Sequence, residues 1–169
     1  MAPMDKNIRP TTDRMRETIF NILSHISGGL QGAKILDVFA GTGAMGIEAI
    51  SRGAATCTFF DKDRKARQLV KKNSTLLKSL DKTTIKNVSA PDFPPSKIAY
   101  DIVFLDPPYD LDVISDTING LKENNYLADQ AILIAEYAAE KEPQFPHFLN
   151  VMTEKTYGDA RFSFLRVMS

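Results

Sequence analysis

Apolar positions near the start of the chain recur at helical spacing. The stretch 11–26 (TTDRMRETIFNILSHI) has apolar residues three or four positions apart, namely Met15, Ile19, Ile22, Leu23 and Ile26. Thr11 or Thr12 suits the N-cap, and Gly28 with Gly29 stops the pattern. We therefore predict a helix over 11–26.

Short apolar runs then alternate with further helical patterns. The predicted strands are 35–39, 55–61, 84–88, 100–106 and 131–137, and the predicted helices are 45–53, 65–80 and 113–124. Residues 150–167 read as two strands around a turn at 157–159. The alternation predicts an α/β fold with a mostly parallel sheet and helices on both faces. The closing strand pair predicts an antiparallel hairpin at one edge.

Length and composition favour one soluble domain. The 169 residues contain no linker, so we expect a single domain over 1–169, with an N-terminal arm and helix in 1–29 and an α/β core in 30–169. The 21 basic and 21 acidic residues balance, which gives no global support for a nucleic-acid partner but leaves room for a local patch. A single cysteine, with no signal peptide or membrane-length run, predicts a cytoplasmic protein without a membrane partner.

A glycine turn follows the first predicted strand. In D-V-F-A-G-T-G-A-M-G (37–46), Gly41, Gly43 and Gly46 match G-x-G-x-x-G between a strand and a helix, where residues without Cβ permit a tight turn and close ligand approach. Asp61 lies 20 residues after Gly41, the usual offset for an acid that binds ribose hydroxyls. The pattern predicts a nucleoside-cofactor site at the carboxyl edge of the sheet.

The glycine turn alone does not separate NAD from S-adenosyl-L-methionine. Asp37, at the end of the first strand, suits the cationic methionine end of S-adenosylmethionine. The same carboxylate would repel the pyrophosphate of a dinucleotide. We therefore expect S-adenosylmethionine.

The fourth predicted strand ends in Asp106-Pro107-Pro108-Tyr109. Strand four of a doubly wound sheet lies beside strand one, so this tetrapeptide should face the glycine turn. The Asp106 carboxylate and the Pro107 carbonyl, held by two restricted prolines, can accept both hydrogens of an exocyclic amine. Tyr109 can stack on the base. These features predict methyl transfer to a base amine by positioning, without a covalent intermediate.

Other reactive side chains receive no role. Cys57 lies in an apolar strand and is expected in the core. His25 and His147 belong to no motif. No metal site is expected.

The segments RPTTDRMRETIFNIL, ILDVFAGTGAMGIEAISRGA and FLDPPYD together resemble the bacterial RsmD-like methyltransferases, from Arg9 almost to the C-terminus. The resemblance implies methylation of the exocyclic N2 of a guanine in small-subunit ribosomal RNA, within a small-subunit particle or an assembly intermediate. It also implies the class I, Rossmann-like methyltransferase fold, a seven-stranded sheet with an antiparallel C-terminal strand. Glu136, after the fifth strand, belongs to the matching region.

The resemblance also assigns residues. The catalytic set is Asp106, Pro107, Pro108 and Tyr109, and the cofactor set is Thr11, Asp37, Phe39, Ala40, Gly41, Gly43, Asp61, Lys62, Ser89 and Ala90. Ser89 stands where the family usually has an acid near the adenine, and Asp61 where it more often has Glu. Eight residues precede the R-P-T block, where the family commonly has a basic β-hairpin, so we expect RNA contacts from Arg9, Arg14 and Arg16.

Three alternatives remain at this point. The same tetrapeptide serves DNA adenine or cytosine amino-methyltransferases, although this chain has no evident target-recognition domain. A non-catalytic RNA-binding assembly factor could retain the fold. An NAD-dependent oxidoreductase would leave Asp37 and the Asp-Pro-Pro-Tyr tetrapeptide unexplained.

Overall fold

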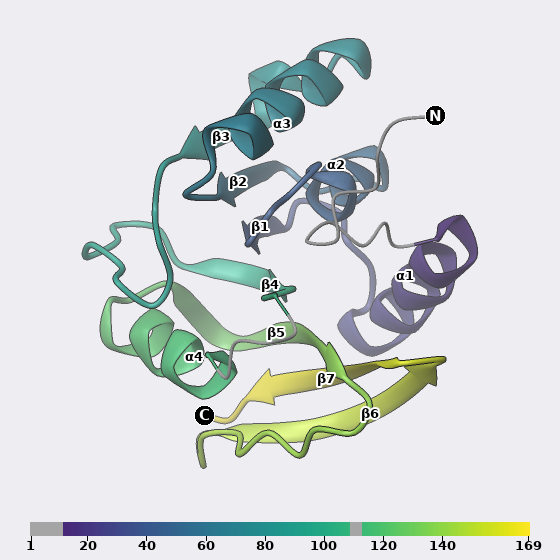
Figure 1. Cartoon of the computed structure of the whole chain (residues 1–169), viewed down its shortest axis with the longest axis vertical. Coiled ribbons are helices and arrows are strands. Elements are labelled where there is room, and N and C mark those ends of the chain that lie inside the picture. Colours follow the sequence, from purple (N-terminus) through teal and green to yellow (C-terminus); the bar gives the residue numbers. More distant parts are fainter. Residues whose placement is uncertain (1–11, 109–112) are drawn as a thin grey trace.

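The computed structural model describes residues 12–108 and 113–169. Seven strands form one sheet in the order β3-β2-β1-β4-β5-β7-β6 (Figure 1). Their bounds are β1 Lys34–Val38, β2 Thr56–Phe60, β3 Thr83–Lys86, β4 Tyr100–Leu105, β5 Leu127–Ala138, β6 Leu149–Tyr157 and β7 Ala160–Val167. The strands β3, β2, β1, β4 and β5 pair in parallel, whereas β7 is antiparallel to both β5 and β6. The predicted mixed sheet with an antiparallel C-terminal strand is confirmed.

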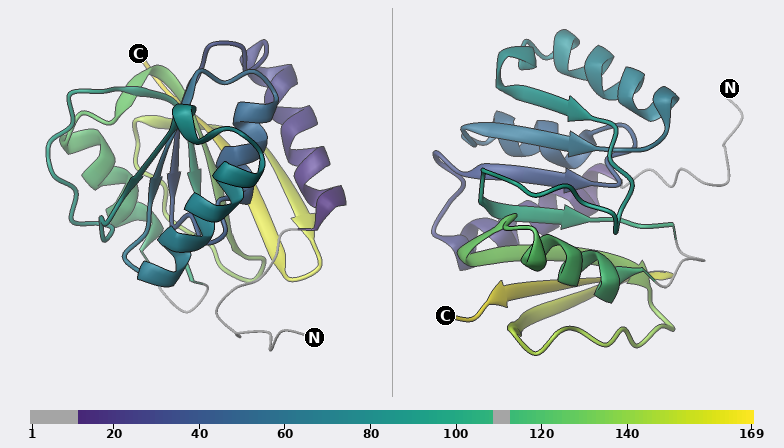
Figure 2. Two further views of the ribbon diagram at one scale, coloured as in Figure 1. Left: turned by 90° about the horizontal axis from the view of Figure 1, so that it is seen from above. Right: turned by 90° about the vertical axis from the view of Figure 1, so that its left-hand side faces the viewer.

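Helices cover both faces of the sheet, as predicted. They are α1 Asp13–Ser27, α2 Ala44–Ser51, α3 Arg64–Leu76 and α4 Ile114–Glu123, with a short 3₁₀ turn at Leu80–Lys82. Figure 2 shows the strands stacked in order, with α4 on the opposite side of the sheet from α1 and α2.

The core divides into two layers because strand side chains alternate between faces. On the α1 and α2 side, Ile35, Phe104 and Ile134 pack with Phe20 of α1. On the α4 side, Leu133 is among the strand residues that pack with Ile118. Each central strand is therefore buried on both sides, which explains the continuous apolar runs in the sequence.

The first helix is capped as its sequence indicates. The Thr12 hydroxyl accepts a hydrogen bond from the Met15 N–H at 3.2 Å, and Gly28 ends α1 in the left-handed region at φ 75°. Of the two predicted N-caps, Thr12 is the one observed, so the helix itself begins at Asp13.

The third helix is shorter than predicted. The sequence pattern extended it to residue 80, but α3 ends at Leu76 and Lys78 takes a positive φ of 53°. As a result Leu76, Leu77 and Leu80 are exposed. In contrast, β5 begins four residues earlier than predicted, because Leu127 pairs with Tyr100 ahead of an irregularity in the register.

The C-terminal hairpin does not simply extend the edge of the sheet. β7, the later strand, pairs with β5, and β6 forms the outer edge. Among the described residues, no helix combines the length and apolarity needed to cross a membrane.

Candidate active site

Three carboxyl side chains lie at the carboxyl edge of the sheet, on the face covered by α1 and α2. Asp37 of β1 pairs in register with Phe104 of β4, and Leu105 of β4 pairs with Ala135 of β5. Asp106 and Glu136 each follow the last of these pairs directly. Because side chains alternate along a strand, both point to the same face as Phe104 and Asp37.

The glycine turn that follows β1 contains three residues with positive φ angles. Phe39, Gly41 and Gly43 have positive φ angles of 61°, 58° and 80°. The Ala40 N–H donates to the Phe60 carbonyl at 3.0 Å, and the Gly43 N–H donates to the Ala40 carbonyl at 2.8 Å. A side chain is tolerated at Phe39, but a Cβ at Gly41 would be strained although the space around it is open. The open side of Gly41 is therefore available to a ligand.

Gly46 has a different role from the other two motif glycines. A Cβ there would lie 2.4 Å from the Phe59 ring and 2.5 Å from Cys57 Sγ. The Gly46 N–H donates to Asp37 Oδ2 at 3.1 Å. Gly46 therefore lets α2 pack closely on β2 and fixes the carboxylate at the end of β1.

Asp61, which directly follows β2, is hydrogen-bonded to the glycine turn. Its Oδ2 accepts the Gly41 N–H at 3.0 Å, and its Oδ1 accepts the Asp63 N–H at 2.9 Å. Each carboxylate oxygen has a second lone pair, so both can still accept a hydroxyl. The side chain is thus oriented for the predicted ribose contact.

Asp37 is the most deeply buried of these carboxyls. It is 3% exposed. Desolvation raises the pKa of Asp37 to about 8, opposed by the Gly46 hydrogen bond and reinforced by the charge of Asp61. At neutral pH the isolated site therefore holds Asp37 largely as the neutral acid.

Asp106 experiences a similar shift from different neighbours. Desolvation by the surrounding protein raises the pKa of Asp106. The charge of Glu136, a hydrogen bond with Glu136 and the charge of Asp37 raise it further. The side chain nevertheless keeps exposed surface, so desolvation is incomplete and the neighbouring carboxyls contribute to the shift. Asp106 is therefore a carboxyl that contacts both solvent and a second, buried carboxyl.

The next two residues continue away from β4. Pro107 is buried and Pro108 is exposed. Both have φ fixed by their rings, which restricts where the Asp106 and Pro107 carbonyls can point.

The remaining predicted cofactor residues lie farther along the chain. Lys62 is exposed, and its carbonyl accepts a hydrogen bond from Arg67 Nη1 at 2.9 Å. Ser89 is exposed, and its carbonyl accepts the Asp92 N–H at 2.9 Å, while Ala90 packs partly against the α4-side core. No side-chain hydrogen bond between these three residues and the glycine turn is found within 12–108 and 113–169.

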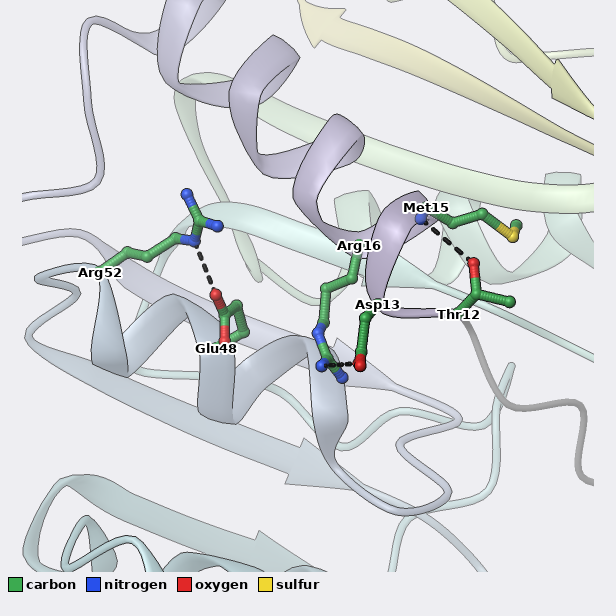
Figure 3. Close-up of polar contacts among 6 residues, drawn as sticks. All are labelled: Thr12, Asp13, Met15, Arg16, Glu48 and Arg52. Atoms are coloured by element: carbon green, nitrogen blue, oxygen red, sulfur yellow. Dashed lines mark hydrogen bonds and ion pairs between the residues drawn. The ribbon is translucent and has the colours of Figure 1, made fainter.

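Two of the predicted RNA-binding arginines, Arg14 and Arg16, lie at the start of α1. Arg14 is exposed, whereas Arg16 Nη2 pairs with Asp13 Oδ1 at 2.5 Å (Figure 3). Figure 3 also shows the Glu48–Arg52 pair on α2, whose guanidinium lies 4.9 Å from the centre of the Phe20 ring. Arg14 is thus accessible, whereas Arg16 is held by Asp13, and their contacts with RNA stay predictions. Arg9, Thr11 and Tyr109 lie outside the described residues, so their assigned roles stay predictions.

Sequence reasoning missed two contributors to the site. Asn73 of α3 donates from Nδ2 to the Thr42 carbonyl at 3.0 Å and so ties the glycine turn to α3. Glu136 was noted only as part of a resemblance, and its link to Asp106 depends on strand order. The available signal was an acid inside an otherwise apolar strand. Within the described ranges, no group of three or more His, Cys, Asp or Glu side chains is arranged to hold a metal ion.

Comparisons with known proteins agree with this architecture. The model of the family described as "Conserved hypothetical protein 95" matches residues 1–166. The chain is 38% identical over 163 residues to "Ribosomal RNA small subunit methyltransferase D" of Escherichia coli, covering 95% of this chain and 80% of that protein.

Solved structures of methyltransferases superpose on this chain. The Escherichia coli protein yhhF superposes with a TM-score of 0.83 at 34% identity, covering 95% of this chain and 89% of the other. An RNA methyltransferase from Salinibacter ruber in complex with S-adenosyl-L-homocysteine superposes with a TM-score of 0.72 over 95% of this chain and 94% of the other, and at 11% identity it shares the fold alone. The expected Rossmann-like methyltransferase fold is confirmed, and the chain belongs to the RsmD family.

Proposed function

We propose that this chain, acting as a single methyltransferase domain over 1–169, transfers a methyl group to the exocyclic N2 of a guanine in small-subunit ribosomal RNA. One observation carries the proposal: the end of β4, with Asp106 and Pro107, lies directly beside the end of β1, with Asp37 and the glycine turn. A methyl donor and an amine acceptor bound at these two strand ends would be adjacent. A relative named above is a small-subunit ribosomal RNA methyltransferase by name, and the family match covers residues 1–166.

The cofactor is S-adenosyl-L-methionine, and the residues present fit it. Asp37 is a buried carboxyl whose Oδ2 accepts the Gly46 N–H, and it can become ionised beside a cationic group. Asp61 presents carboxylate lone pairs for hydroxyls, and Gly41 leaves the turn open. When bound, the cofactor supplies an electrophilic methyl group on a sulfonium. We assign Asp37, Phe39, Ala40, Gly41, Gly43 and Asp61 to its binding, with Lys62, Ser89 and Ala90 near the adenine.

The chain's own residues would prepare the amine. Asp106 and the Pro107 carbonyl each accept one N–H of the exocyclic group, which turns the nitrogen lone pair toward the donor. Tyr109 stacks on the base and fixes its plane. Arg14 and Arg16, with Arg9, contact RNA phosphates at the mouth of the site.

The test is methyl transfer to defined substrates. Purified protein is incubated with radiolabelled S-adenosylmethionine and, separately, small subunits from cells lacking the protein, naked ribosomal RNA, and duplex DNA. We expect label in ribosomal RNA, and mass spectrometry of the digest should identify N2-methylguanosine. Label in DNA alone would favour a DNA amino-methyltransferase, and cofactor binding with no transfer to any substrate would favour a non-catalytic assembly factor.

A further inference from the structure

The second carboxyl of the site, Glu136, has no role in the reaction proposed so far. It lies at the end of β5 and is 8% exposed. On β7 its register partner is Phe162, itself buried. A carboxyl held in such surroundings is costly unless it is neutral or well hydrogen-bonded.

Strand register brings Glu136 to Asp106. The two residues directly follow the Leu105–Ala135 pair of parallel neighbours and point to the same face. This places the two carboxyls within reach of each other, and the charge of Glu136 and a hydrogen bond with it both raise the pKa of Asp106. A hydrogen bond between two carboxyls requires a proton on one of them, because two carboxylates have only acceptors.

We propose that Glu136 positions Asp106 by sharing one proton with it, and that this singly charged pair takes up the proton that the substrate amine loses on methylation. The inference rests on the proposed function. Within the pair, one Asp106 oxygen is held by Glu136, which leaves the other to face the amine. Glu136 is thus a positioning residue and a proton-sharing partner.

The proton balance of the reaction supports this role. The amine nitrogen uses its lone pair to form the new nitrogen–carbon bond, while the donor's sulfur–carbon bond breaks and leaves its electron pair on sulfur. The nitrogen then carries one proton too many. If that proton moves to the Asp106–Glu136 pair, the net charge of the pair changes from −1 to 0, and water receives the proton after the product leaves. A fully ionised pair would repel itself and lose its internal hydrogen bond.

Other charged groups around the pair must be considered in a pH experiment. Asp37 on β1 acts on Asp106 directly, and Asp61 acts on Asp37. The helices on this face also carry the Asp13–Arg16 and Glu48–Arg52 pairs, and β7 carries Arg161, which pairs with Glu142. Of these, Asp37 is the main confounder because its own pKa is about 8.

The principal test uses Glu136→Gln, because a glutamine amide reproduces the hydrogen bond and the net charge of the singly protonated pair. Single-turnover rates are measured from about pH 6 to about pH 10 for both proteins. We expect the variant to be slower than the wild type near neutral pH, by about threefold to tenfold, because its amide cannot share the proton that the pair takes up. Above the pH where the pair loses its shared proton, the variant-to-wild-type ratio should rise by up to about tenfold per pH unit.

The control is Glu154→Gln, which removes a carboxyl from the same sheet. Glu154 Oε1 accepts a hydrogen bond from Ser163 Oγ at 3.1 Å, away from Asp106. The Glu154→Gln ratio should be flat across the same range. A flat ratio for Glu136→Gln as well would overturn the inference.

Infrared spectroscopy of the free protein provides a readout that does not depend on activity. Near neutral pH, we expect the wild type to show protonated-carboxyl absorption from the pair and from Asp37. Glu136→Gln should remove the first contribution and Asp37→Asn the second, so the two are separable. If the Glu136→Gln spectrum retains all of this absorption, no proton is shared and the inference fails. The Glu136→Gln variant could lose this absorption while the wild-type protein methylates no substrate. That result would contradict the proposed function but support the shared proton.

Discussion

Carboxyl side chains have different surroundings at the amino edge and at the carboxyl edge of the parallel sheet. At the amino edge, Asp101 Oδ2 accepts the Lys34 N–H at 2.8 Å, and the Gly32 N–H donates to the Gly53 carbonyl at 2.9 Å. A carboxylate there satisfies a backbone donor. At the carboxyl edge, Asp37, Asp106 and Glu136 gather on one face, and the pKa values of Asp37 and Asp106 are raised.

Carboxyls accept backbone N–H groups at both edges, since Asp37 and Asp61 accept from Gly46 and Gly41. The carboxyl edge differs because its carboxyls also lie close to one another, and their mutual repulsion opposes ionisation. Carboxyls that crowd one another are tolerated, and they become favourable only when a cationic or hydrogen-donating ligand enters. Four changes would test this contrast.

The largest expected effect concerns Asp37 and pH. Because its pKa is raised from 3.8 to about 8, the folded state binds this proton more tightly than the unfolded state between those values. The free energy of unfolding contributed by Asp37 therefore falls as pH rises through this window, at most by about 1.4 kcal/mol per pH unit. Asp37→Asn keeps an acceptor for Gly46 and should remove this slope. Denaturant unfolding of both proteins without cofactor measures it, and parallel curves would contradict the buried neutral acid.

The next effect is on catalysis at Asp106. Asp106→Ala removes one of the two acceptors for the amine, so methyl transfer should fall at least about 100-fold, while cofactor affinity changes much less. Single-turnover rates and cofactor titration separate the two quantities. A comparable loss in both would mean that Asp106 belongs to the cofactor site instead.

A smaller effect compares a glycine from each edge. Gly46→Ala places a Cβ against the Phe59 ring and Cys57 Sγ, so we expect a loss of about 1–3 kcal/mol in the free energy of unfolding. Gly32 has a positive φ of 75° but open space around it, so Gly32→Ala should cost only the backbone strain of about 1 kcal/mol. Chemical denaturation gives both values. Equal costs would show that α2 can shift away from β2.

The smallest effect is expected at Asp101. Asp101→Asn retains an acceptor for the Lys34 N–H, so stability should change by less than about 1 kcal/mol and methyl transfer by less than about twofold. The same unfolding and single-turnover assays apply. A large loss of methyl transfer would show that the amino edge is coupled to the site.

Local patterns predicted the elements of this fold, and they were less reliable about where elements end. The period of apolar residues located every helix and strand described, and the Thr12 cap and Gly28 stop marked α1. The prediction for the end of α3 was wrong. Leu76, Leu77 and Leu80 continue the helical spacing, but α3 ends at Leu76 and Lys78 has a positive φ. Spacing alone does not reveal which apolar residues find a partner.

The site shows the same division. Asp37, Gly41, Gly43 and Asp61 form one connected turn, as the glycine motif indicates. The link between Asp106 and Glu136 spans 30 positions of sequence and arises only because β4 and β5 are neighbours in a fixed register. Contacts that depend on strand order cannot be predicted from local sequence patterns, because the order is known only from the three-dimensional fold.

The insertion of β7 between β5 and β6 has a consequence for synthesis. Of the described elements, β7 is the last to be translated, yet it covers the flank of β5 on which Glu136 pairs with Phe162. Until residues 160–167 emerge, a nascent chain carries β5 with an unpaired row of backbone groups, a surface on which other strands can add. A nascent chain that stalls before residue 160 would therefore lack the strand that covers this flank of β5 and would be open to aggregation.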